Sequence, residues 1–104
     1  VGEFTRAADY WKRAIEVNPW MARYWYGLAQ AQAGSRQWQA CWDTAMQASE
    51  RFPTSIGARQ LLVESNLQLG RSQAAQQAFD WLKRFSPRGM EQITRWYEAH
   101  PLRD

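Results

Sequence analysis

The chain has 104 residues and a mass of 12.2 kDa, and 45% of its residues are hydrophobic, so it supports one folded domain rather than two domains or a disordered segment. One cysteine excludes an internal disulfide, and the absence of any run of about 18 apolar residues predicts no direct membrane insertion. Thirteen Lys and Arg against ten Asp and Glu give a formal net charge of +3, which favours solubility without indicating a partner.

Six amphipathic segments separated by short breaks predict an all-α chain. In chain order, the expected helices cover residues 3–17, 21–33, 36–51, 55–69, 72–85 and 88–99. No segment alternates apolar and polar residues for long enough to indicate a strand. Because the connections are short, consecutive helices are expected to be antiparallel. Gly34 and Gly70 are expected to end the second and fourth helices in the left-handed backbone conformation.

Prolines at a constant spacing divide these helices into units. Pro19, Pro53 and Pro87 recur at one fixed 34-residue interval, and each follows an amphipathic segment that a proline cannot continue. Small or apolar residues recur in register before them: Ala7, Cys41 and Ala75 at twelve residues, Trp11, Ala45 and Phe79 at eight, and Ala14, Ala48 and Leu82 at five. The spacing therefore predicts an internal repeat of paired helices with a 34-residue period.

The repeat resembles the tetratricopeptide repeat (TPR), whose pattern is Trp-x₂-Leu-Gly-x₂-Tyr, then Ala-x₃-Phe, then Pro. Residues 22–55 show Trp25, Leu28, Ala29, Gln32, Cys41, Ala45 and Pro53 at these positions, and residues 56–89 show Arg59, Leu62, Val63, Asn66, Ala75, Phe79 and Pro87. The resemblance implies an α-solenoid of antiparallel helix pairs and a fragment of a longer TPR protein. It divides the chain into a half repeat (1–21), two repeats (22–55 and 56–89) and a terminal helix with a tail (90–104).

Close approach of the paired helices explains the small residues of the pattern. We expect Ala29 to face Cys41, and Val63 to face Ala75. Larger side chains should fill the space between successive units. These larger residues are Leu28, Leu62, Trp11 and Phe79.

The resemblance also implies a concave groove, lined by the first helix of each unit, that binds an extended peptide. The positions so implied are Trp20, Arg23, Tyr26, Gln30, Gln60, Glu64, Gln68 and Arg95, with Thr94 and Glu98 extending the strip. Glutamine suits a peptide backbone because its amide both donates and accepts hydrogen bonds. Trp20 and Trp25 are the candidate aromatic anchors, whereas the other five tryptophans are interpreted as core. The alternative is that the polar positions are ordinary exposed surface.

The first helix lacks the partner helix that a full unit would supply. Its apolar residues cover a broad face, namely Phe4, Ala7, Ala8, Trp11, Ala14 and Ile15. One side of this helix is expected to rest on the helix beginning near Trp20. The other side predicts either a fragment of a longer repeat protein or a homodimer that supplies the cover.

Catalysis and metal binding find no support in the sequence. His100 is the only histidine, so it can build neither a catalytic triad nor a multi-histidine metal site. Cys41 fits a small-residue position and is expected to be a buried structural thiol. The basic cluster of Lys83, Arg84 and Arg88 lies at a helix end, where the helix dipole favours positive charge, so no nucleic-acid partner is predicted.

The sequence therefore predicts a non-catalytic scaffold or protein–protein interaction module, without a cofactor, that binds a peptide or protein in its groove. Three alternatives remain open: a structural or dimerisation spacer, an accessory docking domain of a larger enzyme or membrane-associated protein, and nucleic-acid binding, which the charge pattern disfavours. A cytoplasmic location is favoured, with a membrane-anchored or periplasmic parent protein as the alternative.

Overall fold

The computed structural model describes residues 2–85 and 90–102. Within these residues it contains six α-helices and no strand: α1 (Gly2–Val17), α2 (Ala22–Gly34), α3 (Trp38–Arg51), α4 (Ile56–Gln68), α5 (Ser72–Phe85) and α6 (Met90–Glu98). The all-α prediction is confirmed, and the expected helix limits lie close to the observed ones. Pro87 and the expected start of the last helix at residue 88 lie outside the described residues.

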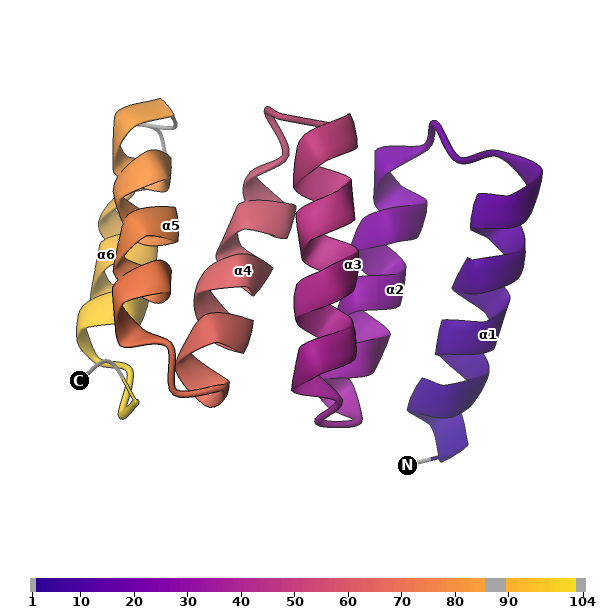
Figure 1. The fold of residues 1–104 in the computed structure, drawn as a ribbon, viewed down its shortest axis with the longest axis horizontal. Helices are drawn as coiled ribbons and strands as arrows, with labels where there is room; N and C mark the ends of the chain where they lie inside the picture. Colours follow the sequence, from indigo (N-terminus) through magenta and orange to yellow (C-terminus); the bar gives the residue numbers. More distant parts are fainter. Residues whose placement is uncertain (1, 86–89, 103–104) are drawn as a thin grey trace.

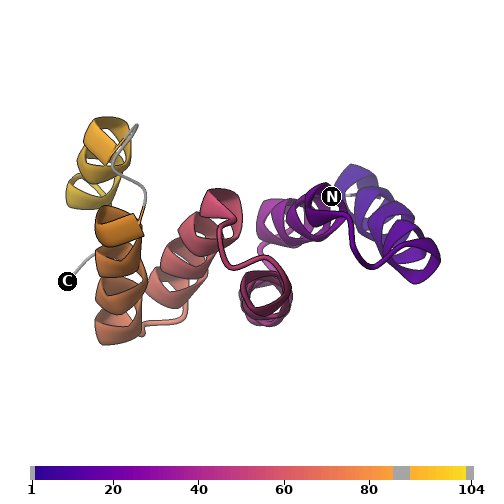
Figure 2. The ribbon, with the colours of Figure 1, turned by 90° about the horizontal axis from the view of Figure 1, so that it is seen from above.

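The helices stand side by side in a row, with α1 and α6 at opposite ends (Figure 1). Each helix packs against its neighbours in sequence, and α2 additionally contacts α4. Seen from above, α3 is displaced to one side of α2 and α4, so the row has two layers (Figure 2). The molecule measures 35 × 27 × 20 Å. This is a helical-repeat-like arrangement in which neighbouring helices are packed in pairs.

The backbone hydrogen bonds of the turns repeat at the predicted period. After α2, Ser35 N donates to Ala31 O, Arg36 N to Ala33 O and Gln37 N to Gln32 O; after α4, Leu69 N donates to Ser65 O, Gly70 N to Leu67 O and Arg71 N to Asn66 O. Each bond of the second set follows its counterpart by one full period. The residues that precede the helices, Met21 before α2 and Ser55 before α4, are separated by the same interval. The internal repeat thus extends from residue types to backbone geometry.

The two glycines expected to end helices behave differently. Gly70 has a φ of +75°, as predicted, whereas in the first unit the left-handed residue is Arg36, with a φ of +60°. The prediction for Gly34 is wrong because this residue is the last one of α2 and lies under an aromatic ring. A Cβ atom on Gly34 would stand 2.4 Å from the ring of Phe4. Close packing of α1 on α2, rather than backbone conformation, requires glycine there.

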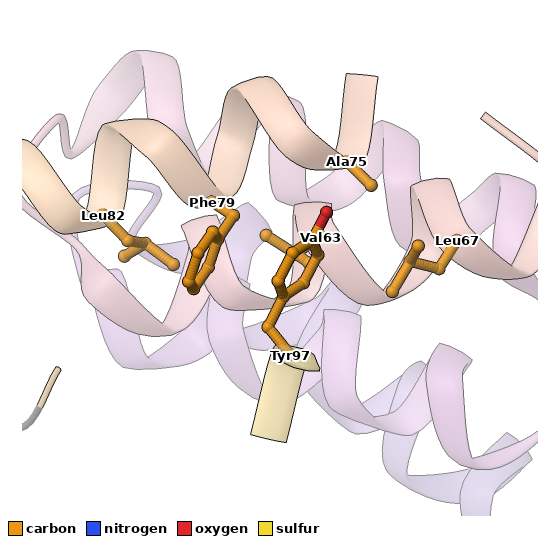
Figure 3. Close-up of a cluster of buried hydrophobic side chains, with 6 residues drawn as sticks. All are labelled: Val63, Leu67, Ala75, Phe79, Leu82 and Tyr97. Carbon is orange, nitrogen blue, oxygen red and sulfur yellow. The ribbon is translucent and has the colours of Figure 1, made fainter. Parts of the chain in front are cut away.

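The largest part of the core lies between α4, α5 and α6. It is a cluster of six buried side chains: Val63, Leu67, Ala75, Phe79, Leu82 and Tyr97 (Figure 3). Val63 and Ala75 belong to this one cluster, as the small-residue pattern predicts. Phe79 stacks on Tyr97 of α6, with ring centroids 4.1 Å apart. In the first unit Ala29 and Cys41 are likewise buried, so the same positions form the core of both units.

Only one side of helix α1 packs against the rest of the molecule. The Trp11 ring lies on Gly27, where a Cβ atom would stand 2.4 Å from the indole, and Phe4 lies on Gly34. These contacts confirm that α1 rests on α2. None of its residues is fully buried, and Tyr10 and Val17 are 64% and 87% exposed.

Among the described residues, no helix is both long and apolar enough to cross a membrane.

Candidate functional site

Side chains from α2, α4 and α6 enclose a hollow of about 200 Å³, here called the α2–α4–α6 groove. Its lining consists of Tyr26 from α2, Gly57, Gln60, Leu61 and Glu64 from α4, and Trp96 from α6. The four α4 residues share one face because Gln60, Leu61 and Glu64 follow Gly57 at helical spacing. Three residues of the predicted groove, Tyr26, Gln60 and Glu64, are therefore brought together.

Tyr26 is held in this groove by its packing on α4. A Cβ atom on Gly57 would stand 2.6 Å from the Tyr26 ring, so the ring lies directly on the glycine backbone. Any other residue at position 57 would displace the ring. The first turn of α4 is set by Ser55, whose side chain accepts a hydrogen bond from the Ala58 backbone N–H. This cap places Gly57 and Gln60 opposite Tyr26.

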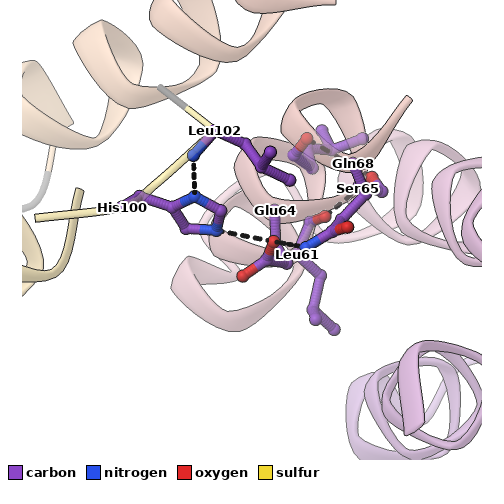
Figure 4. Close-up of polar contacts among 7 residues, drawn as sticks. Leu61, Glu64, Ser65, Gln68, His100 and Leu102 are labelled. Atoms are coloured by element: carbon purple, nitrogen blue, oxygen red, sulfur yellow. Dashed lines mark hydrogen bonds and ion pairs between the residues drawn. The ribbon is translucent and has the colours of Figure 1, made fainter. Parts of the chain in front are cut away.

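Glu64 is bound by groups within the chain at the end of the groove (Figure 4). His100 Nε2 lies 2.8 Å from Glu64 Oε2, and Gln68 Nε2 donates to the same oxygen at 2.9 Å. The backbone N–H of Leu102 donates to His100 Nδ1, which requires the proton of the neutral ring to be on Nε2. His100 therefore donates to Glu64, and this bond ties the segment after α6 to α4.

The other predicted site residues lie outside the groove. Trp20 is 68% exposed and stands beside Arg51 in a separate hollow with Gln47 and Glu50. Arg23 and Gln30 are exposed on α2, where the Arg23 guanidinium lies 5.5 Å from the Tyr24 ring centroid. Gln68 is exposed, and its link to the groove is the hydrogen bond that it donates to Glu64. Arg95 is exposed and forms an ion pair with Glu91. Of the extending positions, Thr94 is half-buried and Glu98 is exposed.

Trp25 has a structural role rather than the predicted anchoring one. Its indole is buried, and Nε1 donates to the backbone carbonyl of Pro19 at 2.9 Å. Arg51 covers the ring at 5.0 Å. The indole thus fastens the loop between α1 and α2 to the core, where a ligand cannot reach it.

Neither Trp96, which lines the groove, nor His100, which binds Glu64, belongs to the set of site residues predicted from the sequence. The two residues are four apart, with Trp96 in the last turn of α6 and His100 just beyond its end, and their rings meet edge to face at 5.7 Å. That spacing was the available signal. The position of Trp96 at the α2–α4–α6 groove depends on the packing of α6 against α5, mainly through Tyr97 and Phe79.

The groove offers noncovalent binding chemistry. Two aromatic rings and Leu61 supply apolar contact, and the Gln60 amide can both donate and accept hydrogen bonds. In the described part of the chain, no group of three His, Cys, Asp or Glu side chains is placed to hold a metal ion. The absence of catalysis stays a prediction.

Neither the known protein family models nor the curated proteins contain a match to this chain. The proposed function therefore rests on the groove geometry and on the internal repeat.

Proposed function

We propose that this chain is a TPR-type interaction module that binds a peptide or protein partner in the α2–α4–α6 groove. The observation that carries the proposal is the convergence of Tyr26, Gln60 and Trp96 from three helices on one hollow. The 34-residue period of residue types and of turn hydrogen bonds supports the assignment to the TPR class.

The lining indicates which part of a partner would enter. Tyr26, Leu61 and Trp96 favour an apolar side chain, because aromatic walls bury large apolar area. The Gln60 amide would hydrogen-bond the backbone beside that side chain, as expected for an extended peptide. Glu64 is occupied by His100 and Gln68, so it contributes a fixed negative charge at one end of the groove.

A selection of peptides from a random displayed library tests this proposal. Peptides that bind the wild-type chain should bind Tyr26→Ala and Gln60→Ala about tenfold more weakly in fluorescence anisotropy, because each variant removes a direct contact. Gln30→Ala is the matched control, since Gln30 is exposed on α2 outside the groove. Equal affinity for all four proteins would contradict the proposal, provided that circular dichroism shows the variants folded.

A second candidate function, dimerisation, is favoured by the outer face of α1. Tyr10, Arg13, Ala14 and Val17 line a hollow of about 360 Å³ together with Tyr24. Light scattering should then show a dimer whose population rises with concentration. Val17→Glu should shift it to the monomer because it places a charge on the apolar face. A wild-type chain that stays monomeric at millimolar concentration would contradict this candidate. If the chain is instead an accessory docking domain of a larger enzyme or membrane-associated protein, its partner would bind in the α2–α4–α6 groove or on this face of α1.

A further inference from the structure

Another hollow, of about 310 Å³, lies between α3, α4 and α5. It is here called the α3–α4–α5 hollow, and its lining includes Trp42 and Met46 of α3, Arg59, Leu62 and Asn66 of α4, and Ala78 and Trp81 of α5, with Arg71 at its edge. By helical periodicity, positions 59, 62 and 66 lie on a different side of α4 from positions 57, 61 and 64. The hollow therefore opens on the face of α4 that is turned away from the α2–α4–α6 groove.

Comparison of the two units shows that the second has lost a buried hydrogen bond in this hollow. In the first unit, Thr44 Oγ1 donates to Gln32 Oε1 at 2.7 Å, and both side chains are buried. The residues one period later are Asn66 and Ala78, and alanine has no donor. Asn66 is only 4% exposed, yet its Oδ1 has no hydrogen-bond partner. A buried acceptor left in this state is costly, so the second unit holds a polar group at this hollow that its own packing does not satisfy.

The second departure between the units places an arginine in the position of a buried tryptophan. Arg59 is the counterpart of Trp25 one period later, and its guanidinium covers the Trp81 ring at 4.2 Å. This contact holds the positive charge over the face of the indole. The buried Nε of Arg59 has no partner in the chain. Burial also lowers the pKa of Arg59, although an arginine keeps its charge.

Positive charge in this hollow is not neutralised within the described residues. Arg71 lies 5.2 Å from the Trp42 ring and donates to Gln39 Oε1 at 3.0 Å. Neither Arg59 nor Arg71 forms an ion pair with a carboxylate of that part of the chain. The hollow thus combines two guanidinium groups, a buried acceptor and apolar walls made of Met46, Leu62 and two indoles.

We propose that the α3–α4–α5 hollow binds an acidic side chain, Asp or Glu, of a partner polypeptide. The carboxylate accepts two hydrogen bonds from the Nη–H groups at the end of the Arg59 guanidinium, a paired geometry that arginine offers to carboxylates. The indoles and Met46 exclude water and contact an apolar side chain beside the acid. This site is independent of the α2–α4–α6 groove and does not rest on the function proposed for it.

The test uses the whole chain and a fluorescein-labelled peptide of three Gly-Leu-Glu triplets, with a Gly-Leu-Gln peptide as the matched control. Fluorescence anisotropy should show saturable binding of the Glu peptide, and binding of the Gln peptide at least about tenfold weaker, because the charged hydrogen bonds are lost. In ¹H–¹⁵N spectra, the indole signals of Trp42 and Trp81 should shift. Equal binding of both peptides, no binding at millimolar concentration, or shifts confined to Trp96 would overturn the proposal.

Two variants assign the contacts. Arg59→Lys keeps the charge but lacks the paired N–H edge, so it should lose at least about tenfold in affinity, whereas Arg6→Lys on exposed α1 should bind as wild type. The double variant Asn66→Gln with Ala78→Thr copies the pair of the first unit. It should raise the melting temperature, because the acceptor is then satisfied internally. It should also weaken binding, because Asn66 and Ala78 line the hollow and the larger Gln and Thr side chains take up part of its space. If Arg59→Lys or the double variant bound the Glu peptide with wild-type affinity, the contact proposed at that position would be overturned. Gln60→Ala changes the other groove, so it should bind the Glu peptide as the wild type does.

Discussion

At the scale of single residues, the two units act as controls for each other. Arg36 and Gly70 occupy equivalent turn positions, with φ of +60° and +75°, but only glycine adopts this conformation without strain. Arg36→Gly removes this strain but gives the unfolded chain more conformational entropy, which opposes part of the gain. The net effect should be a fold more stable by about 0.5–1 kcal/mol. Chemical denaturation measures the change. Gly70→Ala is the reciprocal control and should destabilise the fold; a loss of stability in Arg36→Gly would contradict the argument.

Cys41 predicts a specific dependence of stability on pH. Burial, and to a smaller degree the charge of Glu64, raises the pKa of its thiol from 9.0 to about 11. The unfolded chain therefore loses this proton first as the pH rises, so the thiol's contribution is complete below pH 9 and declines toward pH 11. The decline amounts to about 2 kcal/mol at pH 11.

Cys41→Ala isolates the thiol's contribution from every other effect of high pH on the chain. The substitution should be tolerated, since Ala75 fills the equivalent buried position of the second unit. Denaturation of both proteins at pH 8 and pH 11 should show the wild type losing about 2 kcal/mol more than the variant. An equal loss in both proteins would show that the thiol is not protected by burial.

Residue roles were predictable from the sequence only where the repeat determines them. The burial of Ala29, Cys41, Val63 and Ala75 follows from their register, because equivalent positions of a solenoid meet equivalent neighbours. Trp25 was misjudged because burial of its indole depends on the Pro19 carbonyl and on Arg51, which approach from other segments. For the same reason, register alone does not reveal the unpartnered Oδ1 of Asn66.

At the scale of elements, α6 is attached to the other helices through few side chains. Tyr97 stacks on Phe79, and its hydroxyl donates to Gln76 Oε1 at 2.7 Å. His100 adds the bond to Glu64. Because α6 supplies Trp96 to the α2–α4–α6 groove, this attachment determines the shape of the groove.

Tyr97→Ala should release α6 while the first four helices stay folded. Tyr97 is the fully buried residue of α6, beside the partly buried Met90, Ile93 and Trp96, and its loss should allow local opening rather than global unfolding. Hydrogen exchange should accelerate across residues 90–98 and remain unchanged in α2 and α3. Tyr97→Phe, which keeps the stack and loses the hydroxyl, should show a much smaller effect. Faster exchange throughout the chain would indicate that α6 is part of a single cooperative core.

The helices themselves were the most predictable feature at this scale. Their number within the described residues, their order and their pairing follow from the 34-residue period and the short connections. The groove was predictable only in part. Tyr26, Gln60 and Glu64 follow from register, whereas Trp96 reaches the groove, and His100 reaches Glu64, through the tertiary packing of α6.

At the scale of the whole molecule, each helix contacts only helices close to it in sequence. Within the described chain, the longest-range pairing of helices is α2 with α4, and α1 and α6 do not meet. Stability in such an arrangement is approximately a sum of local terms between neighbours. A defect at one end should therefore weaken that end more than the other.

Gly27→Ala tests this expectation at the α1 end. The new methyl group would stand 2.4 Å from the Trp11 indole, so the ring must move and α1 must shift away from α2, at a cost of about 1–3 kcal/mol. Hydrogen exchange should accelerate in residues 2–17 and stay at the wild-type rate in α4 and α5. Gly2→Ala is the matched control, because no atom lies within 4 Å of the added methyl group. If α4 and α5 lost protection equally, the chain would unfold as one unit, and binding at the α2–α4–α6 groove would then depend on the packing of α1.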